Sequence, residues 1–199
     1  MAKRFTVVSL LGGLLIGCAS TVPAGPDVRR ELEAMFETDQ SHRMKLQELA
    51  LNGDTSSPAF IALAKEQHAI DEANLRRLRQ IVSSNGWPAL SAVGDKASVA
   101  AFLIVQHADP TTQKEYLPLL RASVQSGEAR AEDLALLEDR VLMADGKKQR
   151  YGSQLQAKDK GGWEFYPIED EQHVDERRKA VGLPPLAEYA KQLGVEYRK

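Results

Sequence analysis

The chain has little cysteine and no excess of positive charge. Cys18 is its only cysteine among 199 residues, so no disulfide can form within one molecule. There are 26 lysine and arginine residues against 28 aspartate and glutamate residues, which gives a formal net charge of -2. Because no basic field attracts a phosphate backbone, we expect no nucleic-acid partner.

Long apolar runs and established catalytic motifs are also lacking. The apolar-rich stretch at residues 5–16 is short, whereas a helix needs roughly 20 apolar residues to cross a bilayer. The stretch therefore predicts a removable signal and not a membrane-spanning anchor. Function has to be inferred from the places where polar side chains fall within the predicted elements.

The N-terminal segment has the features of a lipoprotein signal. Lys3 and Arg4 precede the apolar stretch, and Leu15-Ile16-Gly17-Cys18 ends it. These last four residues resemble the bacterial lipoprotein box, which implies cleavage before Cys18 and acylation that tethers the protein to a lipid membrane. Ala19 stands where aspartate would favour the inner membrane, so the outer membrane facing the periplasm is favoured. The alternatives are a plain secretory signal with a coincidental cysteine, or a core helix.

These features divide the chain into three parts. Residues 1–17 are the expected signal peptide, 18–26 the acylated cysteine with a short spacer, and 27–199 a single domain. After removal of residues 1–17, 24 basic and 28 acidic residues remain, a formal charge of -4. Acylation consumes the only thiol, so thiolate chemistry is excluded, and we expect no cofactor.

Apolar periodicity predicts a mainly α fold. The expected buried stripes are Val28, Leu32, Met35, Phe36, Leu46 and Ala50 on the first helix and Ile61, Ala64, Leu75, Leu78 and Val82 on the second. Asp27 fits a helix N-cap, Pro58 fits a first helical position, and Asn85-Gly86 fits a helix end. Residues 99–105 are apolar on every side, which predicts a central, buried helix. We expect a single-domain bundle of about five main helices with a short β-hairpin and two short C-terminal helices. The expected helices are 27–51, 58–85, 99–105, 110–127 with an interruption at Pro118, 131–144, 170–181 and 185–193, and the expected strands are 151–156 and 163–168.

Several short motifs follow one another between residues 85 and 154. They are Gly86-Trp87-Pro88, Val105-Gln106-His107-Ala108-Asp109, Leu117-Pro118-Leu119-Leu120, Asp139-Arg140-Val141-Leu142 and Gln149-Arg150-Tyr151-Gly152-Ser153-Gln154. In these motifs the chain resembles an uncharacterised bacterial family, the domain of unknown function 6624, with Ser153 where threonine is usual. Weaker matches on both sides extend over nearly all of the chain after the spacer. The resemblance implies one helical domain and no settled activity.

Some polar residues fall on the apolar stripes of the first two predicted helices. Asp39 and Arg43 lie four residues apart on the first stripe, and His68 and Asp71 lie on the second. Burying an unpaired charge is costly, so the charged residues should pair with one another or face a wet cavity. They are either a structural ion pair between two helices or part of a site. We expect His68 to be a hydrogen-bonded core histidine.

His107 ends the buried helix, where the helix dipole favours a protonated imidazole. It is a candidate general base if a carboxylate orients it, and otherwise a C-terminal cap. Asp109 precedes Pro110 and is expected to be an N-cap. The spacing of His107 and Asp109 also suits a metal ion, but two ligands without a third do not make a site, and we expect no metal.

Arg140 is expected to be half-buried, on a face of its helix that differs from the main apolar stripe. Its guanidinium could bind a carboxylate or phosphate, or simply brace a buried aspartate. Gln149, Tyr151 and Gln154 lead into the predicted hairpin, and a regular strand would place Gln149, Tyr151 and Ser153 on one face. Such amides and hydroxyls suit the binding of a polar ligand, and they equally suit helix ends.

Two functions of different kinds remain open. The first is an envelope lipoprotein with a pocket for a small polar ligand or cell-wall fragment. We expect the pocket to be built from Asp39, Arg43, Asp71, His107, Arg140 and Tyr151, with Gln149 and Gln154 as further binding residues. In its hydrolytic version, His107 is the base, Asp39 or Asp71 orients it, and Arg140 stabilises negative charge. The second is an inhibitor or immunity lipoprotein that binds a periplasmic protein, with aromatic anchors on the hairpin. These anchors would be Trp163, Phe165 and Tyr166.

Overall fold

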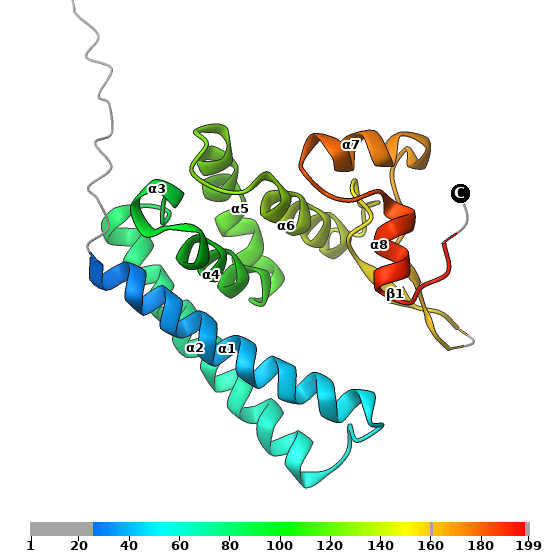
Figure 1. The fold of residues 1–199 in the computed structure, drawn as a ribbon, viewed down its shortest axis with the longest axis horizontal. Coiled ribbons are helices and arrows are strands. Elements are labelled where there is room, and N and C mark those ends of the chain that lie inside the picture. Colours follow the sequence, from blue (N-terminus) through cyan, green and yellow to red (C-terminus); the bar gives the residue numbers. More distant parts are fainter. Residues whose placement is uncertain (1–25, 160, 198–199) are drawn as a thin grey trace, which may run out of the picture.

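A computed structural model describes residues 26–159 and 161–197, and Figure 1 shows their mainly helical arrangement. The expected signal peptide and Cys18 lie outside the described residues. The predicted fold class is confirmed, because helices dominate and the strands form one small antiparallel hairpin. The elements are α1 (Pro26–Leu51), α2 (Pro58–Asn85), α3 (Leu90–Val93), α4 (Asp95–Gln106), α5 (Pro110–Gln125), α6 (Ala131–Ala144), β1 (Leu155–Ala157), β2 (Trp163–Phe165), the 3-10 helix η1 (Glu171–His173), α7 (Val174–Ala180) and α8 (Leu186–Gln192).

Helices α1 and α2 form a long hairpin that extends away from the rest of the molecule (Figure 1). The Ser57 hydroxyl accepts the backbone N–H of Phe60 at 3.0 Å, and Pro58 follows as the first helical residue, as predicted. Leu32 of α1 and Leu78 of α2 are fully buried where the hairpin packs against the main body of the molecule, which is formed by α3 to α6. One end of the hairpin is therefore anchored in the core.

At the far end of this hairpin, apolar residues that were expected to be buried are exposed. Ile61, which was expected on the buried stripe of α2, is 60% exposed, and two apolar residues outside the predicted stripes, Met44 and Leu51, are 68% and 80% exposed. Ala50, which was also placed on the stripe, is exposed as well. Periodicity identifies the apolar face of a helix, but it does not say whether another element covers that face along its whole length. Here α4 covers α1 and α2 only near the body (Figure 1).

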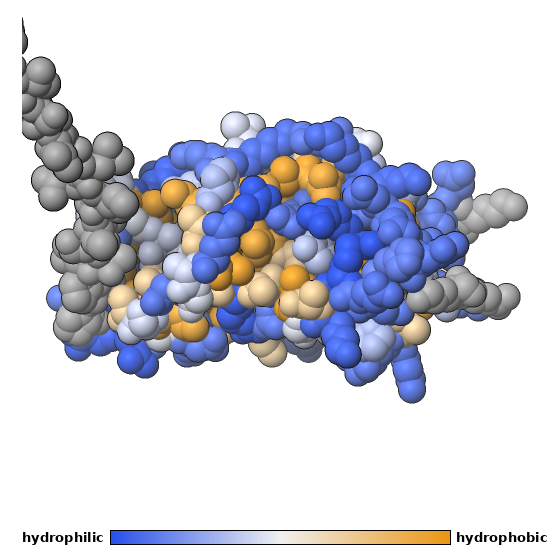
Figure 2. Space-filling view, turned by 90° about the horizontal axis from the view of Figure 1, so that it is seen from above, coloured by the Kyte–Doolittle hydropathy of each residue, from blue (hydrophilic) through white to orange (hydrophobic). Residues whose placement is uncertain are grey.

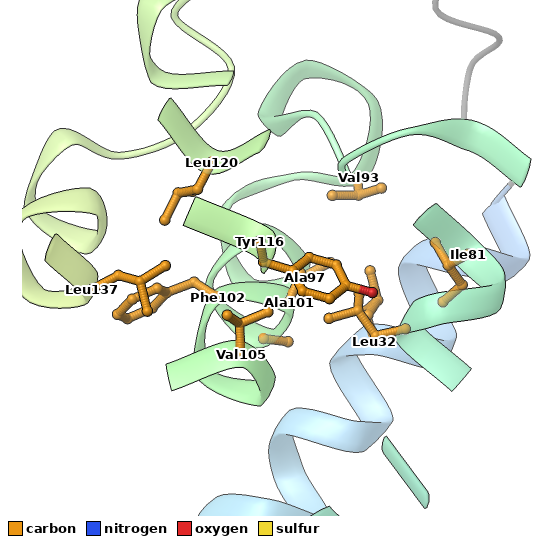
Figure 3. Close-up of a cluster of buried hydrophobic side chains, with 12 residues drawn as sticks. Leu32, Ile81, Val93, Ala97, Ala101, Phe102, Val105, Tyr116, Leu120 and Leu137 are labelled. Carbon is orange, nitrogen blue, oxygen red and sulfur yellow. The ribbon is translucent and has the colours of Figure 1, made fainter. Parts of the chain in front are cut away.

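Helix α4 is the centre of the core, which confirms the prediction of a buried helix at residues 99–105. Seven of its twelve residues are buried, and it packs against α1, α2, α5 and α6. Figure 3 shows side chains from these helices meeting around it. The buried core consists of Leu32, Leu78, Ile81, Val93, Ala97, Ala100, Ala101, Phe102, Val105, Tyr116, Leu120 and Leu137.

Helix α5 begins as predicted but is not interrupted. The Asp109 carboxylate accepts the backbone N–H groups of Thr111 and Thr112, so its N-cap role is confirmed. The expected break at Pro118 is wrong, because α5 runs through it from Pro110 to Gln125. A proline inside a helix removes one hydrogen bond, and here the flanking turns persist without it. The single turn α3 was missed because four residues carry no periodicity.

The C-terminal part forms a smaller lobe with a core of its own, built from Ile168, Val174 and Leu186. Strand β1 pairs with β2 over three residues each, so both predicted strands were too long. No helix of the described residues is both long and apolar enough to cross a membrane. Figure 2 shows that hydrophilic residues cover most of the face seen from above, with apolar patches near its middle.

Candidate functional site

The end of α4 brings His107 to the place where α1 and α2 carry their buried charges. Asp39 and Arg43 are one turn apart on α1, and Asp71 lies opposite them on α2. The Arg43 Nε donates to Asp39 Oδ1 at 2.9 Å, and its Nη2 donates to Asp71 Oδ1 at 2.6 Å. The expected pairing of these three residues is therefore present, and it links the two helices.

Gln67 is a member of this group that the sequence analysis missed. Its Nε2 donates to Oδ1 of Asp39 and to Oδ1 of Asp71, both at 2.9 Å. Gln67 is only 4% exposed, and its Oε1 is buried with no hydrogen-bond partner. Its position four residues before Asp71 was the available signal, because that spacing places both on one face of α2. We call Asp39, Arg43, Gln67, Asp71 and His107 the polar cluster.

His107 is the C-cap residue of α4, and its imidazole lies beside Asp39 without a hydrogen bond. Its Nδ1 is 3.8 Å from Asp39 Oδ2 and is buried with no hydrogen-bond partner. Burial, together with the charges of Arg43 and Arg140, lowers the pKa of His107 to about 4, although Asp39 opposes this shift. The expected stabilisation of the protonated form is therefore wrong, because burial and two cations outweigh the helix dipole.

The two carboxylates of the polar cluster have pKa values shifted in opposite directions. Burial alone would raise the pKa of Asp39, but the hydrogen bonds and charge of Arg43 outweigh it and lower that pKa. Burial raises the pKa of Asp71 despite its hydrogen bonds from Gln67 and Arg43. Neighbouring acids with divergent pKa values are typical of sites that move protons or bind ions.

A pocket of about 290 Å³ opens beside the polar cluster, between α2 and the junction of α4 with α5. Asp71 and His107 line it, so two members of the cluster are reached from solvent. His68 lies at this pocket and is largely exposed, which corrects its expected place in the core. The other lining residues are Glu72, Leu75, Ile104, Ala108 and Asp109. The pocket therefore carries several carboxylates and two imidazoles.

Arg140 lies on α6, close enough for its charge to act on His107, but it is not among the residues that line the pocket. It is half-buried, as expected, and its Nε is buried with no hydrogen-bond partner. Among residues 26–159 and 161–197 it forms no ion pair. Burial and the nearby charge of Arg43 lower its pKa, although Tyr189 opposes this. A half-buried guanidinium without a carboxylate partner is suited to an anionic group from outside the chain.

Gln149, Tyr151 and Gln154 do not line the pocket beside His107. The Gln149 amide donates to the carbonyls of Gln154 and Tyr166, at 3.0 and 2.6 Å, and accepts the N–H of Gln154 at 2.8 Å. The Tyr151 hydroxyl reaches Glu138 at 3.4 Å. These residues precede β1 and form a loop, so the expected strand face of Gln149, Tyr151 and Ser153 does not exist.

Asp139 holds this loop, and the sequence analysis assigned it no role. It is fully buried on α6, and its carboxylate accepts the N–H groups of Arg150, Tyr151 and Ser153 at 2.7, 3.1 and 3.0 Å. Gly152 has a positive φ of 68°, and a Cβ there would lie 2.9 Å from both Ile168 and Leu186. The loop is thus tightly packed, and its hydrogen bonds are made within the chain.

The hairpin aromatics differ in exposure. Trp163 is 58% exposed, whereas Phe165 packs on Tyr189 and Tyr197 with ring centroids 6.3 and 5.7 Å apart. Tyr166 is half-buried. Among the three expected anchors, only Trp163 presents a largely open side chain.

The polar cluster also contains a set of metal-binding side chains. Asp39, Asp71 and His107 each offer one ligand atom, and these atoms all lie within 4.8 Å of one another. The sequence analysis had counted His107 with Asp109, and found no third ligand. Asp109 instead caps α5, while the fold brings two carboxylates from other helices to His107.

The fold and the site define a helical domain with a polar cluster and pocket at the end of its central helix. The chain belongs to the family of unknown function DUF6624, which matches residues 26–198. The resemblance seen in the sequence motifs is thereby confirmed for the domain. No curated protein and no solved structure matches the chain.

Proposed function

We propose that this protein is an envelope lipoprotein, anchored through acylated Cys18, whose helical domain binds a small polar ligand in the pocket beside His107. The outer membrane facing the periplasm is the favoured location. The N-terminal signal and lipoprotein box support the anchoring. The pocket and the polar cluster support the binding.

The observation that carries this proposal is the set of unpartnered polar atoms around the cluster. His107 Nδ1, Gln67 Oε1 and Arg140 Nε are buried, and none has a hydrogen-bond partner. A buried polar group without a partner costs about 1–3 kcal/mol, and a purely structural ion-pair network would satisfy its members. Among these three residues His107 lines the accessible pocket, and an open donor or acceptor in such a pocket is suited to a ligand.

The charges indicate what kind of ligand fits. Arg140 has no acidic partner among the described residues, so it suits a carboxylate or phosphate. Asp71, Glu72 and Asp109 at the pocket suit hydroxyl, amide or ammonium groups. A ligand that fills the pocket and extends to Arg140 would carry both kinds of group, and a cell-wall fragment with sugar hydroxyls, amides and free carboxylates has them.

The same arrangement supports a hydrolytic version of this function. His107 is neutral near pH 7 because its pKa is about 4, so the imidazole nitrogen is unprotonated, and a bound anionic substrate that raises this pKa toward 7 would strengthen it as a base. Asp39 remains ionised beside it and would stabilise the protonated ring. Arg140 would stabilise the negative charge that develops on an attacked carbonyl.

Small molecules released from the purified protein test this proposal. We expect mass spectrometry to find an anionic polar compound bound to the wild-type protein, and its loss in an Arg140→Ala variant. Arg76→Ala is the matched control, because Arg76 on α2 is 70% exposed and pairs only loosely with Glu72 at 3.9 Å. Equal amounts of the compound in all three proteins, or none in any of them, would contradict the proposal.

A second candidate function is the binding of a periplasmic protein partner. The observation in its favour is the exposure of Met44, Leu51 and Ile61 at the projecting end of the α1–α2 hairpin. Apolar side chains grouped on an uncovered end are common at interaction surfaces. Chemical cross-linking in cells tests it, with Ile61→Lys expected to abolish any cross-linked partner and Trp163→Ala to leave it in place.

A further inference from the structure

We propose that the polar cluster binds a divalent transition-metal ion through Asp39, Asp71 and His107. Their ligand atoms lie within 4.8 Å of one another. Ligand atoms held about 2.1 Å from one ion lie at most about 4.2 Å apart, so small side-chain rotations bring all three to an ion. The three residues come from α1, α2 and the end of α4, so the packed helices fix their relative positions.

Gln67 supplies an independent observation that points to a ligand. It is 96% buried, and its Nε2 is fixed 2.9 Å from one oxygen of each aspartate. The Oε1 of the same amide has no partner, which leaves a buried carbonyl oxygen beside the two carboxylates. Such an oxygen is a suitable neutral ligand for a cation. An ion in the cluster would give His107 Nδ1 the partner that it lacks, and a half-turn of the Gln67 amide would bring Oε1 to the ion in place of Nε2.

Arg43 is the group that competes with the ion. Its guanidinium contacts Oδ1 of Asp39 and Oδ1 of Asp71, so it already neutralises part of the negative charge. Its side chain is 29% exposed and can turn toward solvent, which would free both oxygens. Because one cation replaces another, removal of Arg43 should strengthen metal binding. A purely structural ion pair makes no such prediction.

The donor set indicates the kind of ion. Two carboxylates, one imidazole and one amide oxygen form a mixed nitrogen and oxygen environment, which suits Zn²⁺, Mn²⁺ or Fe²⁺. Mg²⁺ and Ca²⁺ prefer oxygen ligands alone. With Asp71 and His107 also lining the pocket, the ion would be accessible to the ligand of the proposed function. The inference concerns that same site and rests on it.

Calorimetric titration of the chelator-treated, dialysed protein with Zn²⁺ and with Mn²⁺ tests the inference. We expect one ion per chain, and a loss of affinity of about tenfold or more in both His107→Ala and Asp71→Asn. Arg43→Met should bind the ion about tenfold more tightly than the wild type, because a competing positive charge is gone. Asp71→Asn keeps the shape of the side chain, so it remains informative if His107→Ala does not fold.

His173→Ala and Asp170→Asn are the matched controls, because they make the same replacements at two exposed residues that lie outside both the pocket and the metal-binding set. Their affinities should equal that of the wild type. The inference is overturned if neither the wild type nor Arg43→Met binds an ion, or if the controls weaken binding as much as His107→Ala does. Loss of the released ligand in Arg140→Ala is measured separately, so the metal site and the proposed function can fail independently.

Discussion

Arg43 is the residue whose replacement most clearly probes the polar cluster. It joins α1 to α2 through Asp39 and Asp71, at 2.9 and 2.6 Å. Removing one partner of a buried ion pair costs about 3–5 kcal/mol. The side chains of Arg43 and Asp71 are 29% and 27% exposed, so water can solvate the carboxylates that are left unpaired and reduces this cost. We therefore expect Arg43→Met to lower the free energy of unfolding by about 2–3 kcal/mol at pH 7.

The loss of unfolding free energy in Arg43→Met should also depend on pH. Arg43 lowers the pKa of Asp39 in the folded protein, so the pair stabilises the fold above the ordinary aspartate pKa, and this stability is lost as pH falls. In Arg43→Met the burial of Asp39 is left to raise its pKa, so at pH 4 this carboxyl takes up a proton and no unpaired charge remains there. The difference between wild type and Arg43→Met should therefore be smaller at pH 4 than at pH 7. Replacing Asp39 and Asp71 by asparagine in the Arg43→Met background should recover part of the loss, because no buried charge is then left unpaired.

Urea unfolding followed by circular dichroism, at pH 7 and pH 4, measures these differences. Arg76→Met serves as the control, since its exposed side chain should change stability by no more than about 0.5 kcal/mol. A loss below about 0.5 kcal/mol in Arg43→Met at pH 7 would refute the reasoning. An equal loss at both pH values would refute the electrostatic part of it.

Three further predictions concern other parts of the chain. Burial raises the pKa of Asp133 to about 6, so ionisation of this carboxyl lowers the stability of the fold as pH rises from about 4 to 7. Urea unfolding should therefore show that the free energy of unfolding of Asp133→Asn rises relative to that of wild type by up to about 2–3 kcal/mol between these pH values. Asp139→Asn should lower the unfolding free energy by about 2–4 kcal/mol, with faster amide hydrogen exchange at residues 150–153, because a neutral amide replaces the carboxylate that accepts their N–H groups. Cys18→Ser should abolish incorporation of labelled palmitate in growing cells, and continued labelling would contradict acylation at this residue.

Much of the fold could be predicted because its signals are local. Ser57 with Pro58, Asp109 with Pro110, and the glycines after the helices define most helix ends through a few backbone hydrogen bonds. The exposure of Ile61 could not be predicted, because burial at that end of the hairpin depends on whether another helix reaches it. The first strand was predicted to begin too early, because Asp139 on a distant helix holds residues 150–153 in a loop.

Within the candidate site, the charged pairs could be predicted from the sequence, whereas the position of His107 could not. The spacing of Asp39 and Arg43 on an apolar stripe predicted a buried pair, and Asp71 was its natural partner. The approach of His107 to Asp39 depends on how α4 packs across two other helices, which no local pattern contains. The depressed pKa of His107 depends on that packing too, since burial is its largest cause.

Nuclear magnetic resonance of the histidine rings tests the central claim most directly, because the chain has only four histidines and single replacements assign their signals. The purified protein is titrated with soluble cell-wall fragments released by muramidase digestion. We predict saturable shifts of the His107 ring signals, with His173, an exposed residue paired with Asp170, unchanged. No shift at His107, or equal shifts of all four histidines, would contradict ligand binding at this pocket.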